Sequence, residues 1–259
     1  MPESPLLEER DGAVLTLTLN RPEKRNAMTV PMITAFRDAV RAAAGDPSLR
    51  VLVVAGAGKA FCAGLDLKEM GRARGPDGAV EYPDLEDALH DLERLPVPTI
   101  AMMQGDAIAG GLELALHCDL RVAAATARMG MPLARIGLVV PYALTQKLLD
   151  TAGTVATKAL LFTGRILDAE AARAAGLVNQ VVPEDALAAT TRALAAEIAG
   201  NAPLSVRAMK AAILEAGSFR AREPSPAVAE LAHAARTSAD LQEGLRAVFE
   251  KRRARFEGR

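Results

Sequence analysis

Two short segments contain the residues whose types and spacing best suit chemistry. Residues 60–67 are A-F-C-A-G-L-D-L, and residues 104–115 are Q-G-D-A-I-A-G-G-L-E-L-A. In each, a short apolar strand breaks into small residues and then enters a helix. Such a break leaves backbone N–H groups unpaired at the start of the helix. Two breaks that face each other would hold one oxygen between two N–H donors, which stabilises negative charge developing on a carbonyl.

A single carboxylate, Glu113, follows Gly110 by three residues. Its neighbours along the predicted helix are all apolar, so we expect the helix to be buried. A buried carboxylate is unfavourable unless it is paired or used. Glu113 is therefore a candidate acid or base for proton transfer. Two structural alternatives remain, an acid favoured by the helix dipole and an ion pair with a neighbour such as Arg121.

Composition excludes several other classes of function. Lys and Arg number 31 against 32 Asp and Glu, which argues against a nucleic-acid-binding surface that depends on bulk charge. Cys62 and Cys118 form no disulfide framework, and with no signal-like N-terminus they indicate reduced thiols in a cytoplasmic protein. No apolar run approaches the ~20 residues that cross a bilayer. His90, His117 and His233 lack metal-ligand spacing, so we expect no metal.

Apolar periodicity predicts the elements that must position the two segments. The predicted strands are residues 14–19, 51–55, 100–103 and 120–124, and the predicted helices include one that follows Thr29 and one over residues 84–95. Thr29 can cap its helix, and Pro31 suits the first turn. Strands alternating with helices indicate a layered α/β fold. We expect residues 1–11 to be a frayed lead, residues 71–78 a loop, and the chain after Ala143 to be nearly all helical.

These two segments and four others resemble the crotonase superfamily, also called the enoyl-CoA hydratase/isomerase family. The matching segments are L-N-R-P at 19–22, A-G-L-D-L-K-E-M at 63–70, A-I-A-G-G-L-E-L-A at 107–115, C-D-L-R-V-A at 118–123, L-L-F-T-G-R-I-L-D-A-E-A-A-R-A-A-G-L-V-N-Q-V-V at 160–182 and F-E-K-R-R-A-R-F at 249–256. Six matches in the right order are highly specific and span nearly the whole chain.

The resemblance implies a fold and an assembly that periodicity does not show. The fold is an α/β crotonase (ClpP-like) spiral of ββα turns. Residues 1–199 would form the spiral core with the acyl-CoA site, and residues 200–259 a C-terminal helical trimerisation domain. The implied partner is an acyl-CoA thioester substrate, with no cofactor because coenzyme A is part of that substrate. The implied assembly is a homotrimer or a dimer of trimers.

The resemblance also assigns roles to individual residues. The backbone N–H groups of Leu65 and Gly110 would hold the oxygen of a thioester enolate, and Glu113 would move a proton at C2 or a nearby carbon. The implied substrate-binding residues are Lys24, Arg25, Ala63, Asp66, Leu67, Gly111, Leu133, Tyr142 and Lys251. Of these, Lys24 and Arg25 fall where the family contacts the nucleotide end of CoA, and Lys251 could add charge there. For Asp66, helix capping is favoured over catalysis.

The sequence departs from the family pattern at Leu133. Hydratases of this family usually carry a second glutamate after G-x-P, and here that position is Leu133. Two carboxylates grip the attacking water in hydration, whereas one is enough for a double-bond isomerase. The V-P-Y stretch ending at Tyr142 is similar to that of methylmalonyl-CoA decarboxylases, but these have a histidine where Leu65 stands. The alternatives are therefore an α-carboxyacyl-CoA decarboxylase and an acyl-CoA-binding protein without catalysis.

Overall fold

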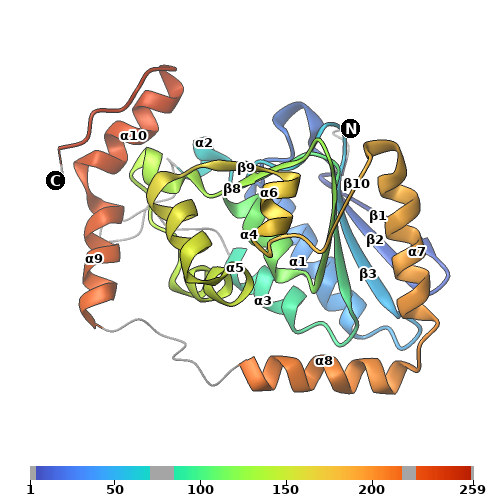
Figure 1. Cartoon of the computed structure of the whole chain (residues 1–259). Coiled ribbons are helices and arrows are strands. Elements are labelled where there is room, and N and C mark those ends of the chain that lie inside the picture. The colour runs from blue at the N-terminus through green and yellow to red at the C-terminus, as the bar shows by residue number, and fades with distance from the viewer. Residues whose placement is uncertain (1–3, 71–84, 218–225, 258–259) are drawn as a thin grey trace.

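The structure is a computed structural model that describes residues 4–70, 85–217 and 226–257. Over these residues the chain forms two mixed sheets with helices around them (Figure 1). The larger sheet has the order β1-β2-β3-β5-β7-β10 and the smaller one β4-β6-β8-β9. The strands of the larger sheet are β1 (Leu6–Asp11), β2 (Val14–Leu19), β3 (Val51–Gly56), β5 (Thr99–Met103), β7 (Leu120–Ala124) and β10 (Gln180–Val182). Those of the smaller sheet are β4 (Ala60–Cys62), β6 (Asp106–Ile108), β8 (Arg128–Gly130) and β9 (Ile166–Asp168).

The larger sheet is covered on both faces, which explains its nearly continuous apolar strands. In β3, Leu52 and Val54 belong to the main core, while Val51 and Val53 belong to a second cluster on the other face. The main core includes helix α1 (Val30–Ala44), and the second cluster includes helix α7 (Leu187–Ala199). Figure 1 shows α1 and α7 on opposite sides of this sheet. The predicted strands of the layered α/β fold are thus confirmed.

Local signals placed α1 correctly. Thr29 is its N-cap, and the hydroxyl accepts a hydrogen bond from the N–H of Met32 at 3.4 Å. Pro31 stands in the first turn, where its missing N–H leaves no bond unmade. The predicted helix over residues 84–95 is also present as α3 (Leu85–Glu93). The loop predicted at residues 71–78 lies outside the described residues.

Two predictions of secondary structure were wrong. Residues 6–11 are not a frayed lead but strand β1, antiparallel to β2 from Leu6 opposite Leu19 to Asp11 opposite Val14. Only the first residue of β1 is buried, so its sequence shows no apolar alternation. The region after Ala143 is also interrupted by strands β9 and β10, each of three residues. Strands this short form because an existing sheet edge offers them hydrogen bonds, so local sequence carries little sign of them.

The smaller sheet joins the two segments that the sequence singled out. Strands β4 and β6 are parallel neighbours, with Ala60 opposite Asp106 and Cys62 opposite Ala107. Helix α2 (Leu67–Met70) follows β4, and helix α4 (Gly110–His117) follows β6. Because the strands are parallel, both strand-to-helix breaks lie at the same edge of the sheet. This pairing is what brings the two turns together.

The remaining helices form the C-terminal half of the molecule (Figure 1). They are the 3₁₀ helices η2 (Pro132–Ile136) and η3 (Glu184–Ala186), and the α-helices α5 (Tyr142–Thr163), α6 (Ala169–Ala174), α8 (Pro203–Gly217), α9 (Pro226–Thr237) and α10 (Ala239–Phe249); a further 3₁₀ turn, η1 (Pro22–Lys24), precedes α1. Leu241 and Leu245 of α10 pack against Leu138, just after η2. Within the described ranges, no helix is long and apolar enough to span a membrane.

Candidate active site

The two strand-to-helix turns pack backbone against backbone. A Cβ atom placed on Gly64, which has a φ of +92°, would lie 3.0 Å from the carbonyl oxygen of Ile108 and 3.1 Å from the nitrogen of Gly110. A Cβ on Gly110 would lie 3.6 Å from the nitrogen of Leu65. Glycine at position 64 is required both by its positive φ and by this close approach. The N–H groups of Leu65 and Gly110 are therefore near neighbours in space.

Neither of these N–H groups is taken up by the described part of the chain. Met28 forms a parallel bridge with Leu65 in which the N–H of Met28 donates to Gly64 at 2.7 Å, and the N–H of Asp66 donates to Met28 at 2.9 Å. The Leu65 N–H therefore donates to neither partner in this bridge. Gly110 opens α4, where the first N–H groups have no partner within the helix. The arrangement can hold one oxygen between two donors.

Ala109, the N-cap of α4, has an unusual backbone conformation. Its φ is 52° and its ψ is −122°, a region that residues with a Cβ rarely occupy and that costs about 1–3 kcal/mol. Its N–H donates to Gly130 at 2.9 Å, and its carbonyl accepts the N–H of Glu113 at 3.0 Å. Bonds on both sides thus hold the turn that presents the Gly110 N–H.

Glu113 is buried and unpaired. It is 7% exposed, and its carboxylate has no hydrogen bond or ion pair with any described residue. Burial raises the pKa of the Glu113 carboxyl to about 8, and the negative charge of Glu86 adds to the rise. A carboxyl with such a pKa can both donate and accept a proton near neutral pH.

Arg121 is not the partner of Glu113, so that alternative is excluded. Its guanidinium donates to three backbone carbonyls, with distances of 2.8 Å to Leu177, 2.7 Å to Cys118 and 3.4 Å to Ala115. The far end of α4 is anchored separately, because Nδ1 of His117 lies 2.8 Å from the carbonyl oxygen of Glu113. Burial lowers the pKa of His117 to about 4, so the neutral ring donates this bond through Nδ1.

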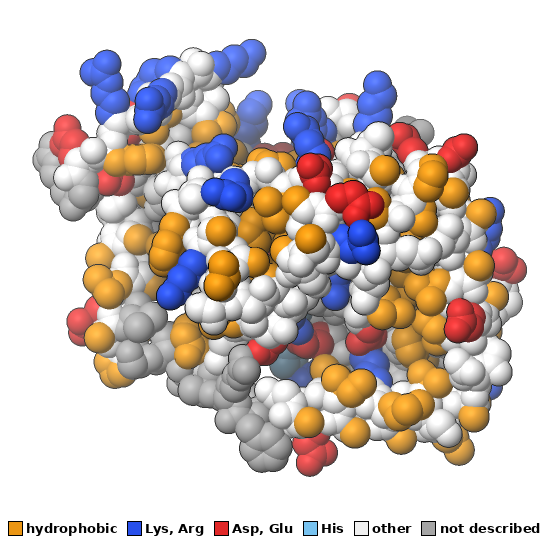
Figure 2. All heavy atoms as spheres, viewed as in Figure 1, with side chains coloured by type: hydrophobic (Ala, Val, Ile, Leu, Met, Phe, Trp, Pro, Cys, Tyr) orange, Lys and Arg blue, Asp and Glu red, His pale blue; other side chains and the backbone are white. Residues whose placement is uncertain are grey.

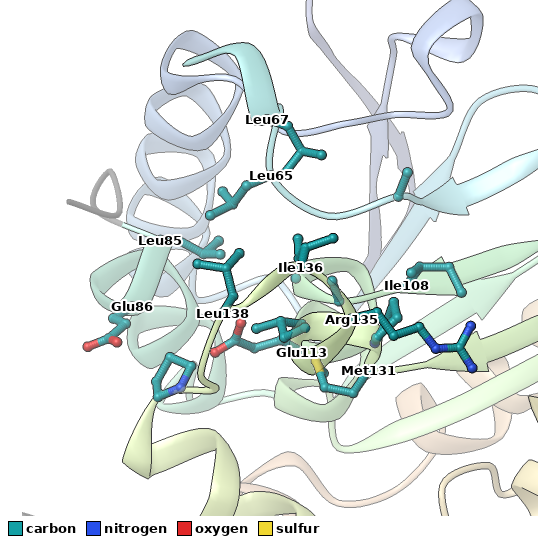
Figure 3. A pocket seen from close by; sticks show the side chains of 16 residues that line it. Leu65, Leu67, Leu85, Glu86, Ile108, Glu113, Met131, Arg135, Ile136 and Leu138 are labelled. Atoms are coloured by element: carbon teal, nitrogen blue, oxygen red, sulfur yellow. The ribbon is translucent and has the colours of Figure 1, made fainter. Parts of the chain in front are cut away.

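A cavity of about 330 Å³ adjoins the two turns and Glu113 (Figure 3). The described residues of its lining are mostly aliphatic, and the charged ones among them are Glu86, Glu113 and Arg135. The apolar part of the wall comprises Ala63, Leu65, Leu67, Leu85, Ile108, Ala109, Met131, Pro132, Leu133, Ile136, Leu138 and Pro141. Such a site suits an uncharged chain whose polar end reaches the two N–H groups.

Most of the residues predicted for the acyl end line this cavity. They are Ala63, Leu65, Leu67, Gly110, Glu113 and Leu133. Gly111 does not line the cavity but packs against the backbone of β4. A Cβ on Gly111 would lie 2.0 Å from the carbonyl oxygen of Cys62. Tyr142 begins α5 directly after Pro141, which lines the cavity, but Tyr142 is not itself part of the wall.

Asp66 has structural partners, as capping predicted. Its carboxylate accepts a hydrogen bond from the N–H of Lys68 at 3.0 Å and pairs with Arg21 at 2.8 Å. Burial alone would raise the pKa of Asp66, but the Arg21 hydrogen bond and the Lys68 N–H outweigh it and lower the pKa. Asp66 thus caps α2 and fastens it to the chain before α1.

The basic residues predicted for the nucleotide end lie on the surface. Lys24 and Arg25 are exposed on and after η1, and Lys251 is exposed just after α10. None of the three lines the described cavity. Sequence reasoning missed Glu86 and Arg135 as cavity residues. Glu86 stands on an amphipathic helix whose polar face resembles any solvated face, so local sequence gave no signal for it.

The two cysteines are buried thiols, away from solvent. Burial raises the pKa of both Cys62 and Cys118 to about 12, so neither is a thiolate near neutral pH. Across the part of the chain that the structure describes, no group of three or more His, Cys, Asp and Glu side chains could hold a metal ion.

Comparison with known proteins identifies the family. The enoyl-CoA hydratase/isomerase family model matches residues 9–259. The chain belongs to this family. A putative enoyl-CoA hydratase of Thermus thermophilus is 39% identical over 256 residues, covering 97% of this chain and all of that protein. The two mixed sheets with C-terminal helices are thus the crotonase fold.

Solved structures of enoyl-CoA hydratase/isomerase relatives agree with this fold. An enoyl-CoA hydratase/carnithine racemase from Magnetospirillum magneticum has a TM-score of 0.80 at 34% identity, covering 98% of this chain and 96% of that one. A methylmalonyl-CoA decarboxylase bound to 2-nitronate-propionyl-CoA has a TM-score of 0.89 at 26% identity, covering 98% of both chains. One family fold thus accompanies different reactions, so the reaction must be argued from the site.

Proposed function

We propose that this protein processes an acyl-CoA thioester through an enolate, as a hydratase or an isomerase. The N–H groups of Leu65 and Gly110 receive the thioester oxygen, and Glu113 moves the proton. The observation that carries this proposal is the unpaired, buried Glu113 in the same cavity as the two free N–H groups.

In the proposed mechanism, the acyl group enters the aliphatic cavity and its carbonyl oxygen lies between the two N–H donors. Negative charge grows on this oxygen as the enolate forms, and each donor contributes about 2.7–4 kcal/mol to the transition state. Glu113 takes a proton from one carbon and returns it to another in isomerisation, which needs one carboxyl group. In hydration it takes a proton from the water whose oxygen bonds to C3, and it then delivers a proton to C2 of the enolate. Leu133 lines the cavity, and the family resemblance aligns it with the second glutamate of hydratases, so water would be held from one side.

The nucleotide end and the assembly are part of the same proposal. Lys24, Arg25 and Lys251 are exposed cations that suit the phosphates of CoA. Residues 200–259 would form the oligomerisation domain of a homotrimer or a dimer of trimers, and residues 1–199 the catalytic core. Leu204 and Ile213 of α8 are exposed apolar side chains, and Figure 2 shows hydrophobic side chains along this edge. A second subunit would cover them.

The test is loss of the enoyl-thioester absorbance of crotonyl-CoA, with wild type and Glu113→Gln measured side by side. Fast loss in wild type alone would support hydration with a single glutamate. If neither protein consumes crotonyl-CoA, a 3-enoyl-CoA is the next substrate, and formation of the conjugated 2-enoyl product by wild type alone would support isomerisation. Full turnover by Glu113→Gln on the substrate that wild type uses would refute the role of Glu113.

A decarboxylase is the second candidate, because the decarboxylase structure matches with a TM-score of 0.89 and V-P-Y ends at Tyr142. Decarboxylation needs the two N–H donors but no strong base. Leu65 occupies the place of the decarboxylase histidine, which counts against this candidate. Release of carbon dioxide from methylmalonyl-CoA would establish it, and tight acyl-CoA binding without any product would instead support a binding protein.

A further inference from the structure

Helix α3 brings a second carboxylate, Glu86, to the cavity. Glu86 lines the wall next to Leu85, but it is exposed to solvent. It has no hydrogen bond or ion pair with any described residue. Figure 3 shows the Glu113 carboxylate pointing toward the side of the cavity on which α3 carries Glu86. Among the described residues, nothing pairs with this negative charge at the rim of the cavity.

Arg135, the cation among the described lining residues, does not neutralise this charge. Its Nε donates to the carbonyl oxygen of Thr163 at 3.3 Å. Figure 3 shows its guanidinium on the opposite side of the cavity from Glu86 and Glu113. An acyl group that passes Glu113 toward α3 therefore approaches a carboxylate and moves away from the arginine.

The charge of Glu86 already acts inside the cavity. It contributes to the raised pKa of Glu113, after burial itself. The surrounding wall is aliphatic, with Leu85 and Leu138 on this side, and low-dielectric walls weaken the screening of a charge. Any further negative charge brought into the same space would meet the same repulsion.

We infer that Glu86 is a specificity-determining residue that makes the cavity reject acyl groups bearing a carboxylate and accept uncharged apolar ones. This inference rests on the proposed acyl-CoA function and names its substrate class. It concerns binding and not proton transfer, so it is separable from the role of Glu113. Because Glu86 is exposed, its replacement should leave the fold intact.

The experiment compares two unreactive ligands of equal chain length, valeryl-CoA and glutaryl-CoA, which differ by a terminal carboxylate. Dissociation constants are measured by titration calorimetry at pH 7 and low ionic strength. For wild type we expect glutaryl-CoA to bind about tenfold more weakly than valeryl-CoA. Glu86→Gln should remove most of this difference, and Glu86→Lys should reverse it, with valeryl-CoA binding little changed.

The matched control is Asp87→Asn, because Asp87 is the exposed neighbour on the same helix and does not line the cavity. It removes the same charge from the surface and should keep the wild-type ratio. Salt should shrink the ratio in wild type. Equal binding of the two ligands by wild type, or an unchanged ratio in Glu86→Gln, would overturn the inference. If neither ligand binds, the acyl-CoA function itself is wrong, and the inference falls with it.

Discussion

Two buried ionisable groups in this molecule have opposite surroundings. Lys210 of α8 is 6% exposed, and its ammonium group donates to Asp119 at 2.7 Å and to the carbonyl oxygen of Val97 at 3.0 Å. Asp119 also accepts bonds from the N–H and the hydroxyl of Thr99, at 2.7 and 3.0 Å. Glu113 is equally buried, yet its carboxylate has no partner among the described residues.

The first of these groups holds the fold together, whereas the second is available for chemistry. The Asp119 junction ties the start of β5, the turn before β7 and helix α8 together, and every charge in it is balanced. At the cavity, the Glu113 carboxyl and the N–H groups of Leu65 and Gly110 are left unsatisfied, which destabilises the free protein but leaves them available to a ligand. Satisfied groups should therefore matter to stability, and unsatisfied groups to activity.

The largest expected effect is the loss of activity when one of the unsatisfied N–H groups is removed. Gly110→Pro removes one N–H donor at the first position of α4 and should lower kcat on the true substrate about 10²–10³-fold. Gly110→Ala is the matched control, since it keeps the N–H; its Cβ would lie 3.2 Å from the end of the Met28 side chain, 3.4 Å from the Cα of Gly64 and 3.6 Å from the Leu65 nitrogen. Steady-state kinetics and thermal unfolding are measured on both variants. Equal kcat values for the two would mean that the Gly110 N–H does not hold the oxygen.

The next effect is the loss of stability when the buried Lys210 loses its partner Asp119. Asp119→Ala leaves Lys210 buried without its counter-charge and should lower the free energy of unfolding by about 3 kcal/mol. Its control is Asp106→Ala, which breaks the two-bond pair of Asp106 with Arg128. Arg128 is exposed, so this loss should be much smaller than that of Asp119→Ala. Urea unfolding of both variants measures the two losses in free energy of unfolding. Similar losses would show that the Asp119 junction is no more important to stability than the exposed pair.

The smallest effect is a gain in stability on removing Glu113. Its pKa is about 4.5 in the unfolded chain and about 8 in the fold. The folded state therefore binds the extra proton between these values, and the stability that this provides is lost as pH rises through 8. Glu113→Gln does not titrate, so at pH 6 it should be more stable than wild type by roughly 2 kcal/mol.

The pH series checks this prediction. The advantage of Glu113→Gln should shrink as pH falls toward 5, because Glu113 then becomes protonated in the unfolded chain as well as in the fold. Urea unfolding at several pH values measures it. An advantage that is the same at pH 5 and pH 8 would show that the gain does not come from the titration of Glu113.

Local sequence was a good guide where an element depends on its own residues. The cap at Thr29, the strand at residues 120–124 and the helix within residues 84–95 all lie where the sequence placed them. It failed for β1, whose outer residues are exposed and whose pairing depends on β2. It also failed for β9 and β10, because strands of three residues depend on the sheet beside them.

The sequence by itself determined the family and the motif turns, and it identified Glu113 as the carboxyl group of interest. The turns could be recognised from sequence because their backbone geometry requires particular residues. Gly64, for example, has a positive φ and a close backbone contact. Only the tertiary structure decided that Arg121 serves the backbone and leaves Glu113 unpaired. It also revealed the charge of Glu86 at the cavity rim. Both facts concern distances between separate elements, which periodicity along the chain does not encode.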